Sequence, residues 1–598
     1  MFHLEINVRK LKIVLGDLSY DNSLMKGNLY VPLGAGYLAA YASKLFGESV
    51  SIRIFKDPSA LLDYAKREKP DFAGFSHYFW NKELNRLVSR KLRSMLDKSV
   101  TIVFGGPSID SDPEMLLSTC QSYPDVNAVV PNEGEQGFAN IIEALLSGAG
   151  FRDALDGVAF ERDGGLLSGR SIGLSTDLDT VPSPYLSGIL DPFMIGKYQP
   201  MLQTSRLCPY TCAFCVSGKN EGKLRAFPIE QAKAEIDYIA SRYKDHPDLL
   251  MYISDENFGI LDRDVEIAQH IQDGSVNTGY PKKLFYYNDK KFGKTSRAVH
   301  DIVGHMCFHG LTLSLQTENP ETLKAIKRRN MSVAQLNEAI AWGRSKNMPI
   351  TTELIFGLPM ETRQSFLELI DKCFEMNFDN VHCYNLIIFD GIILNRPRVR
   401  QQYEIETKFR HVSGSFLHLD DDFCAEAEEV VVGATGFDID DFMLIRRINV
   451  LLYTISYLHM HTAFFAHLRQ LGLRFTVFAE KLFDPANTSE AVDKEYADFI
   501  SDLNTAIHSE LFDTRDELVE HMRHFSEHAG GEIPEPVKIN AEFGRRMVRN
   551  SNGWVARLLQ RTLAKSLTGG DREEILEHAA SLLQQDAKQP LNDTLEQA

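Results

Sequence analysis

Three of the chain's eight cysteines lie close together, as Cys208, Cys212 and Cys215. Three thiolates on one short loop can ligate three irons of a cubane cluster and leave the fourth iron without a protein ligand. Such an open coordination position distinguishes a catalytic metal centre from a closed structural one. Structural zinc would need a fourth ligand, and neither Cys nor His follows until His246, while a disulfide would leave one thiol unpaired. The spacing therefore favours a catalytic iron–sulfur centre over both alternatives.

The spacing Cys208-x3-Cys212-x2-Cys215, with Phe214 before the last cysteine, resembles the signature of radical S-adenosylmethionine (SAM) enzymes. The resemblance implies a [4Fe–4S] cluster held by the three cysteines, whose open iron binds the amino and carboxylate groups of SAM. Reduction of that cluster would cleave SAM to a 5′-deoxyadenosyl radical. Phe214 is then expected beside the adenine. Further SAM contacts are implied at positions on the later strands: Ser254, Asp255, Glu256, Gln316, Glu353 and Gly357.

Some polar residues near the motif have a simpler interpretation as well. Without the cysteines, Asp255 and Gln316 would be read as strand-end caps. Lys219 and Arg225 follow the cysteine loop and could pair with the SAM carboxylate or a substrate acid, or be solvated surface charges.

The elements around the cysteines predict a partial parallel (β/α)6 barrel over residues 198–395. Six apolar runs alternate there with amphipathic helical stretches, which is typical of parallel β/α units. The cysteine run directly follows the first expected strand, in the kind of loop where a barrel places its chemistry. The expected strands are 201–207, 249–254, 284–288, 311–316, 351–356 and 382–388.

The first 150 residues predict a doubly wound, Rossmann-like parallel sheet, with strands at 11–15, 50–55, 72–76, 100–104 and 128–130. Ligands of such sheets bind at the carboxyl ends of the strands. A domain of this kind before a radical SAM barrel resembles the cobalamin-binding class of that superfamily. The cobalamin contacts that the resemblance implies are Ser76, His77, Tyr78, Trp80, Asn81, Gly105, Gly106, Pro107, Glu133 and Gly134.

The loop after the first strand departs from cobalamin domains in which histidine replaces the lower cobalt ligand. Those domains carry Asp-x-His-x-x-Gly, whereas the chain has Asp17 followed by Ser19 and Asn22 at the other two positions. Cobalt is therefore expected to take no ligand from this loop. The loop after the third strand would supply the lower face, with Trp80 as an apolar floor and His77 more simply a packed histidine than a ligand. A sheet that binds no cofactor is the alternative.

The combined resemblance implies a cobalamin-dependent methyltransferase acting on an unactivated carbon of a small molecule or natural-product intermediate. A radical rearrangement, cyclisation or oxidation without methyl transfer is a second hypothesis, and a non-catalytic corrinoid-binding protein is a third. A methylthiotransferase is disfavoured, because the first 150 residues offer only Cys120 and cannot bind that family's auxiliary cluster. The protein partner would be an electron donor such as flavodoxin or ferredoxin.

Composition sets the remaining expectations. The 598 residues are 44% hydrophobic and carry a net charge of −18, which disfavours nucleic acid as substrate because that ligand needs a basic face. The most apolar segment, 448–468, contains Asn449 and three histidines and predicts a buried helix or helix pair rather than a membrane span. No secretory signal is evident, so the cytoplasm is expected. Residues 151–197 are expected to be a connector and 396–598 a mainly helical C-terminal domain.

Overall fold

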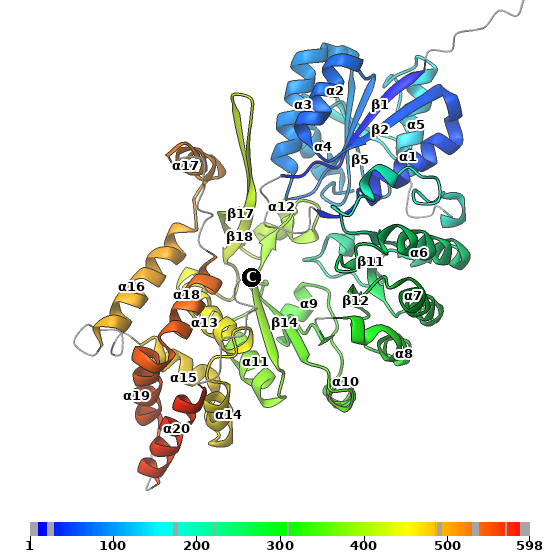
Figure 1. Ribbon diagram of the computed structural model, residues 1–598. Helices are drawn as coiled ribbons and strands as arrows, with labels where there is room; N and C mark the ends of the chain where they lie inside the picture. The colour runs from blue at the N-terminus through cyan, green and yellow to red at the C-terminus, as the bar shows by residue number, and fades with distance from the viewer. Residues whose placement is uncertain are drawn as a thin grey trace, which may run out of the picture.

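The computed structural model describes residues 10–20, 29–171, 177–219, 222–307, 310–484, 486, 493–528, 538–567 and 571–586. Within these ranges the chain forms a front α/β domain, then an open barrel, then a C-terminal region in which helices predominate (Figure 1). No helix among the described residues is long and apolar enough to cross a membrane.

The front domain is built on a seven-stranded sheet in the order β2-β1-β3-β4-β5-β6-β7. The first five strands are parallel and the last two antiparallel, so the predicted doubly wound sheet is confirmed. The strands are β1 (Leu11–Gly16), β2 (Val50–Phe55), β3 (Phe72–Ser76), β4 (Thr101–Gly105), β5 (Ala128–Val130), β6 (Ala159–Arg162) and β7 (Gly165–Ser168). The helices are α1 (Leu33–Phe46), α2 (Pro58–Glu68), α3 (Lys82–Leu96), α4 (Pro113–Ser122) and α5 (Glu135–Leu146).

Local sequence explains where these elements start. The Asp57 carboxylate accepts from two backbone N–H groups at the start of α2, and Asp112 accepts from the Glu114 N–H at the start of α4. Each is followed by a proline suited to the first helical position. The strands between are short apolar runs that are buried on both faces, as parallel strands are. The strand order turns back at β1, and the neighbouring β1 and β3 therefore open a crevice at their carboxyl ends.

The barrel consists of six parallel strands in two groups, β12-β11-β8 and β13-β14-β15, which confirms the predicted partial barrel. A short antiparallel pair, β9 (Ser205–Arg206) with β10 (Arg225–Ala226), brackets the cysteine loop. The barrel strands are β8 (Met201–Leu202), β11 (Met251–Phe258), β12 (Leu284–Asn288), β13 (Leu311–Thr312), β14 (Ile350–Phe356) and β15 (Asn380–Asn385). The helices are α6 (Ile229–Tyr243), α7 (Asp264–Thr278), α8 (Lys294–Val303), α9 (Pro320–Ala325), α10 (Val333–Ser345) and α11 (Arg363–Glu375).

The C-terminal region begins with a long β-hairpin that the sequence did not predict. β17 (Glu406–Leu419) and β18 (Asp422–Gly433) pair antiparallel, and β16 (Ile387–Ile388) joins β18. The prediction of a mainly helical region over 396–598 did not include these two strands. The described helices that precede and follow the hairpin are α12 (Pro397–Gln402), α13 (Ile439–Ser456), α14 (Thr462–Gln470), α15 (Phe475–Leu482), α16 (Lys494–Ser509), α17 (Arg515–His528), α18 (Ile539–Arg549), α19 (Ala556–Ser566) and α20 (Arg572–Asp586).

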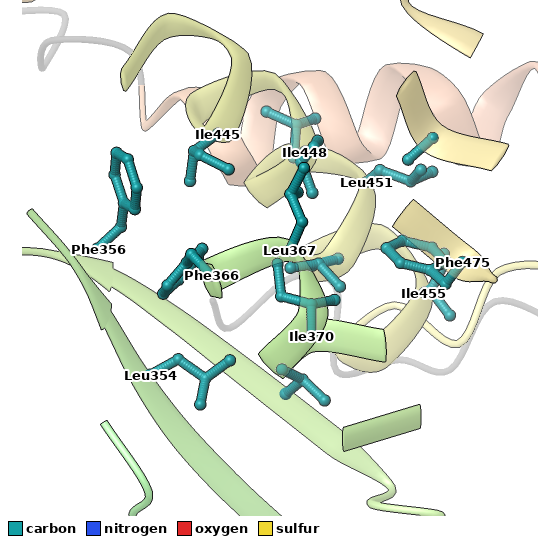
Figure 2. Packing of buried hydrophobic residues seen from close by; sticks show 14 of the residues in the cluster. Leu354, Phe356, Phe366, Leu367, Ile370, Ile445, Ile448, Leu451, Ile455 and Phe475 are labelled. Atoms are coloured by element: carbon teal, nitrogen blue, oxygen red, sulfur yellow. The ribbon is translucent and has the colours of Figure 1, made fainter. Parts of the chain in front are cut away.

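The barrel and the C-terminal helices share one hydrophobic core. Strand β14 and helix α11 supply its barrel side, and α13 and α15 its C-terminal side (Figure 2). The ring centroids of Phe356 and Phe366 lie 4.9 Å apart. Helix α13 is buried along most of its length, which confirms that its apolar sequence is a buried helix. The residues labelled in the figure are Leu354, Phe356, Phe366, Leu367, Ile370, Ile445, Ile448, Leu451, Ile455 and Phe475.

The hairpin also contacts the front domain, beside α3 (Figure 1). The buried Glu426 of β18 accepts hydrogen bonds from the Tyr20 hydroxyl and from the backbone N–H groups of Glu83 and Leu84, at 2.7, 2.9 and 3.0 Å. It thus caps the N-terminus of α3 from a distant part of the chain. Burial, together with the nearby Glu83, raises the pKa of Glu426 to about 8.

Candidate functional site

A cavity of about 750 Å³ lies between the carboxyl edge of the front sheet and the mouth of the barrel. Residues that flank the cysteines, Leu207, Val216 and Ser217, line it from the barrel side. Ten residues predicted from the sequence also line it: Ser76, Tyr78, Trp80, Gly105, Gly106, Pro107, Glu133, Gly134, Ser254 and Glu256. The structure therefore brings the predicted cobalamin loops and part of the predicted SAM site to one space.

Small residues keep the front-domain wall of this cavity open. A Cβ atom added at Gly34 would meet no atom within 4 Å, and at Gly105 its nearest neighbour would be the Val130 carbonyl oxygen at 3.5 Å. Gly106 has φ +111°, and a Cβ there would lie 3.1 Å from the His77 carbonyl oxygen. Glycine at these positions lets a large group lie against the backbone, which fits the expected macrocycle.

The loop after β3 contributes an aromatic surface. The rings of Tyr78 and Trp80 stack with centroids 4.3 Å apart, and Phe79 lies edge-on to Trp80 at 5.0 Å. All three line the cavity. The expectation that Trp80 forms a floor under the corrin stays a prediction, and this placement is compatible with it.

His77 and Asn81 occupy different places from those expected of cobalamin contacts, because neither lines the cavity. The His77 ring stacks on Phe104 at 4.8 Å, and its Nε2 lies 3.3 Å from the Tyr123 hydroxyl. Burial lowers the pKa of His77 to about 3. The Asn81 amide donates to the carbonyl oxygens of Leu18 and Ser76 at 3.0 and 3.1 Å. Both side chains hold the loop from behind.

The loop after β1 is described only through Tyr20, so Asp21 and Asn22 of the histidine-motif comparison lie outside the described residues. Asp17, which begins that motif, lines the cavity and pairs with Lys56 at 3.0 Å.

The cysteine loop is held at its middle and its end by backbone hydrogen bonds. The Ala213 N–H donates to the Ile326 carbonyl at 2.9 Å, and the Leu394 N–H donates to the Ala213 carbonyl at 3.2 Å. The Cys215 N–H donates to the Cys212 carbonyl at 3.0 Å, which closes the loop into a turn. Phe214 packs against the shared core and does not line the cavity. Its predicted contact with adenine is untested.

The three cysteine side chains are free thiols with donors beside them. The Asn257 amide donates to Cys208 Sγ at 3.1 Å, and Arg328 Nη1 lies 3.9 Å from Cys212 Sγ. Burial raises the pKa of Cys208 and of Cys215. Within the described ranges no three His, Cys, Asp or Glu side chains are grouped to hold a single metal ion. A donor set of three thiols with nearby N–H groups fits an iron–sulfur cluster.

Strand β11 divides its three predicted residues between two faces. Ser254 and Glu256 line the cavity, whereas the intervening Asp255 points the other way, as alternation along a strand requires. Asp255 accepts from the Thr204 backbone N–H at 2.7 Å, and from the hydroxyls of Thr204 and Ser205 at 2.6 and 2.8 Å. It therefore anchors the chain that leads into the cysteine loop, as a strand-end cap would. Burial raises the pKa of Glu256, which accepts from the Ser217 hydroxyl at 3.3 Å.

The remaining predicted SAM contacts do not line this cavity. Glu353 accepts from the Ser314 hydroxyl at 2.7 Å. Gln316 has φ +64°, and its buried Oε1 has no partner among the described residues, so it is free to accept a hydrogen bond. A Cβ atom added at Gly357 would lie 3.1 Å from Leu386 Cβ, so protein covers the face of Gly357 on which a side chain would stand.

For Lys219 the sequence left two interpretations open, a contact with SAM or substrate and a solvated surface charge. The Lys219 ammonium group donates to the carbonyl oxygens of Pro107 and Ile109 at 2.6 and 2.7 Å. The side chain is buried at the cavity, so the interpretation of Lys219 as a solvated surface charge is wrong. Burial lowers the pKa of Lys219 to about 8. Lys219 thus ties the 3₁₀ turn after the cysteines, η6 (Val216–Lys219), to the front-domain loop after β4.

No functional role was predicted for Arg206 from the sequence. It ion-pairs with Glu133 and Glu135 across the same boundary. The only sequence signal was its place two residues before Cys208.

Two family models match the chain. The model described as "Radical SAM superfamily" matches residues 202–373, and the "B12 binding domain" model matches residues 26–142. They cover most of the barrel with its cysteine loop and most of the front sheet. The matches confirm the predicted cofactor set, since a radical SAM domain binds a [4Fe–4S] cluster and SAM and the other domain binds cobalamin.

Named relatives align with about two-thirds of the chain. It is 30% identical over 397 residues to "Cobalamin-dependent radical SAM methyltransferase TokK" of Streptomyces tokunonensis, covering 63% of the chain and 56% of that protein. It is 29% identical over 396 residues to "2-(S-pantetheinyl)-carbapenam-3-carboxylate methyltransferase" of Streptantibioticus cattleyicolor, with the same coverage of each. The chain thus spans little more than half the length of these relatives.

A solved structure extends the likeness in fold to almost the whole chain. The structure of the "Cobalamin-dependent S-adenosylmethionine radical enzyme OxsB", with aqua-cobalamin and SAM bound, aligns with a TM-score of 0.52 at 14% identity. The alignment covers 97% of the chain and 84% of that structure. At this identity the likeness establishes the fold, including the C-terminal region.

Proposed function

We propose that this chain, which matches both the radical SAM and the B12-binding family models, is a cobalamin-dependent methyltransferase acting on an unactivated carbon of a small molecule. One observation carries the proposal: a single cavity is lined both by the strand ends of the B12-binding sheet and by residues beside the three cysteines. Two cofactor sites that open onto one space can serve the same substrate atom.

The proposed reaction balances with two SAM molecules and two electrons. A substrate hydrogen joins the deoxyadenosyl group of one SAM, which leaves as 5′-deoxyadenosine and methionine. A second SAM gives its methyl group to the substrate carbon and leaves as S-adenosylhomocysteine. Two electrons from a carrier such as reduced flavodoxin or ferredoxin neutralise the two sulfonium charges. When bound, the cluster and cobalamin supply the radical and methyl-carrying chemistry.

The chain's own residues bind, orient and exclude water. Cys208, Cys212 and Cys215 would hold the cluster. Glu256, turned into the cavity beside Ser254, can accept hydrogen bonds from an ammonium group such as that of SAM. The stacked rings of the loop after β3 cover the front-domain side with apolar surface, which keeps water from a reactive radical.

A small-molecule substrate is supported by charge and by the relatives. The chain is acidic, with a net charge of −18, and offers no general attraction to nucleic acid. The S. cattleyicolor relative is named for methylation of a carbapenam carboxylate, which is a small molecule.

Anaerobic reconstitution followed by product analysis tests the proposal. With SAM, cobalamin and a low-potential reductant, the protein should form 5′-deoxyadenosine and S-adenosylhomocysteine together when given a substrate. Formation of 5′-deoxyadenosine alone would favour a non-methylating radical reaction. Cluster and cobalamin binding without any SAM cleavage would favour a corrinoid-binding protein. The Cys212→Ala variant is the matched control, because it should lose the cluster and both products.

A further inference from the structure

Arg206 joins the cysteine loop to the front-domain loop after β5. It is the last residue of β9, two positions before Cys208, and its side chain is almost entirely buried. Its guanidinium donates to Glu135 at 2.8 Å and to Glu133 at 3.4 Å, and its Nε donates to Gln203 at 3.0 Å. One planar group thus contacts two carboxylates of the front domain and one amide of the barrel.

Two aromatic rings fix the plane of this guanidinium. Its central carbon lies 4.8 Å from the ring centroid of Tyr37 and 5.2 Å from that of Phe227. The two rings are stacked, with centroids 5.3 Å apart and planes inclined by 10°. Tyr37 belongs to α1 of the front domain and Phe227 follows β10 of the barrel. The arginine is therefore oriented by aromatic contacts from both domains as well as by its hydrogen bonds.

Arg225 repeats the connection from the neighbouring strand. Arg225 lies opposite Arg206 in the antiparallel β9–β10 strand pair, and its guanidinium donates to Glu133 at 3.2 Å. Glu133, which lines the cavity, is therefore shared by two arginines that bracket the cysteine loop. Burial alone would raise the pKa of Glu135, but the charge and hydrogen bond of Arg206 hold it below its usual range. The Glu135 carboxylate is thus an ionised partner of Arg206.

We propose that Arg206 and Arg225 are positioning residues that set the distance and orientation between the cysteine loop and the cavity-lining loop at Glu133–Glu135. The inference rests on the proposed function, in which hydrogen abstraction and methyl transfer must meet at one substrate carbon. The two loops belong to different domains, and these arginines are charged contacts that join them beside the cavity. A change in this geometry leaves hydrogen abstraction possible but separates it from methyl transfer.

The Arg206→Lys variant tests this role, because lysine keeps the charge but cannot span two carboxylates and an amide from one planar group. The ratio of 5′-deoxyadenosine to methylated product should rise on the order of tenfold or more, since a displacement of about 1 Å can cost about 100-fold in rate. Cluster content and cobalamin content should stay at wild-type levels. The matched control is Arg242→Lys, because Arg242 forms an ion pair with Asp191 that is far more exposed.

A second measurement is independent of turnover. Pulsed EPR of the protein loaded with reduced cluster and cob(II)alamin reports the distance between the two spins. The distance distribution should be narrow in the wild type and in Arg242→Lys, and broader or longer in Arg206→Lys. If Arg206→Lys loses either cofactor, Glu135→Gln decides by the same measurements, because it neutralises the nearer carboxylate partner of Arg206, is not a predicted cobalamin contact and leaves the cysteine loop unaltered.

An unchanged product ratio together with an unchanged distance distribution in these variants overturns the positioning role. A wild-type protein that forms 5′-deoxyadenosine without S-adenosylhomocysteine overturns the proposed function instead. The EPR comparison still decides the role of the arginines in that case.

Discussion

The barrel shares apolar contacts with both of its neighbours, and the boundary with the front domain adds directed, charged contacts beside the cavity. Toward the C-terminal helices it presents fully buried residues of the shared core such as Phe366 and Ile370, together with ion pairs such as Arg474 with Asp371. Toward the front domain, the contacts that border the cavity are directed and charged. They are Arg206 with Glu133 and Glu135, and Lys219 with two backbone carbonyls. Outside the cavity lining, Lys82 pairs with Asp390, and Arg396 of the C-terminal region pairs with Asp110.

The difference separates two tasks. Apolar burial is strong and non-directional, so it holds a domain in place without specifying the position of any one loop. An ion pair within a buried boundary is costly to form but defines an orientation through its hydrogen bonds. The core with the C-terminal helices therefore stabilises the barrel, while the charged boundary aligns the two cofactor sites.

The largest expected effect comes from the apolar boundary. Phe366→Ala should lower the free energy of unfolding by about 3–5 kcal/mol, because it leaves a cavity in a fully buried core. The measurement is the urea unfolding transition followed by circular dichroism, at low and at high salt. The loss should be the same at both salt concentrations. Phe366→Leu is the control, and a loss confined to low salt would contradict an apolar boundary.

The next effect is a pH dependence at Lys219. Burial lowers the pKa of Lys219 to about 8 from its usual value of 10.5, so between these pH values the unfolded chain binds a proton that the folded chain does not. The free energy of unfolding should therefore rise with pH across this window, by up to about 3 kcal/mol from this group.

Lys219→Met should remove this rise, which urea unfolding at a series of pH values measures. The exposed Lys44, whose ammonium donates to the Thr180 carbonyl, supplies the control variant Lys44→Met. Equal pH dependence in wild type and Lys219→Met would show that the buried amine does not titrate in this range.

Asp110→Asn weakens the charged boundary at the loop after β4. Asp110 is buried and accepts from Arg396 at 2.9 Å. Removing its charge should cost about 2 kcal/mol, the usual scale of a hydrogen bond to a charged group. Faster hydrogen exchange in residues 106–112, with unchanged exchange in α13, would show that the boundary with the front domain opens independently of the core around α13. Asp156→Asn, in the exposed pair with Arg170, is the control.

The smallest effect belongs to the tip of the hairpin. Asp422 pairs with Arg90 and Lys91 of α3, each at 2.8 Å, where the side chains of Asp422 and Arg90 are largely exposed. Asp422→Asn should cost less than about 1 kcal/mol, and the cost should disappear when salt is raised from about 0.05 to 0.5 M. Unfolding midpoints at the two salt concentrations measure it. A cost that persists in high salt would mean that the hairpin tip resembles the buried pairs.

The strands of the front sheet and the barrel were predictable because each is a short apolar run between helices with clear start signals. Asp57 and Asp112 mark two of those starts. The cysteine loop was predictable because its ligands lie within one stretch of sequence.

The directions in which individual side chains point were harder to predict from the sequence. Ser254, Asp255 and Glu256 were all predicted to contact SAM, but alternation turns Asp255 away from the cavity. His77 and Asn81 lie in a loop without a regular period, so nothing in the sequence indicated that they point behind it.

Contacts between distant segments could not be predicted. Arg206 and Glu133 are 73 positions apart, and Glu426 lies 343 positions from Glu83. The hairpin escaped prediction because its pairing shifts register twice, which breaks the strict alternation that identifies a strand. Its acidic and aliphatic residues therefore suggested a helix.

The position of Glu426 at the start of α3 has a consequence for how the molecule can open. The front domain contacts the barrel, the barrel shares its core with the C-terminal helices, and the hairpin from that region returns to the front domain through Glu426. The three parts thus close a ring of contacts. A linear chain of domains can hinge at one joint, but a closed ring separates only when two joints break together. We therefore expect a bulky ligand to enter by local movement of loops at the cavity mouth rather than by separation of the domains.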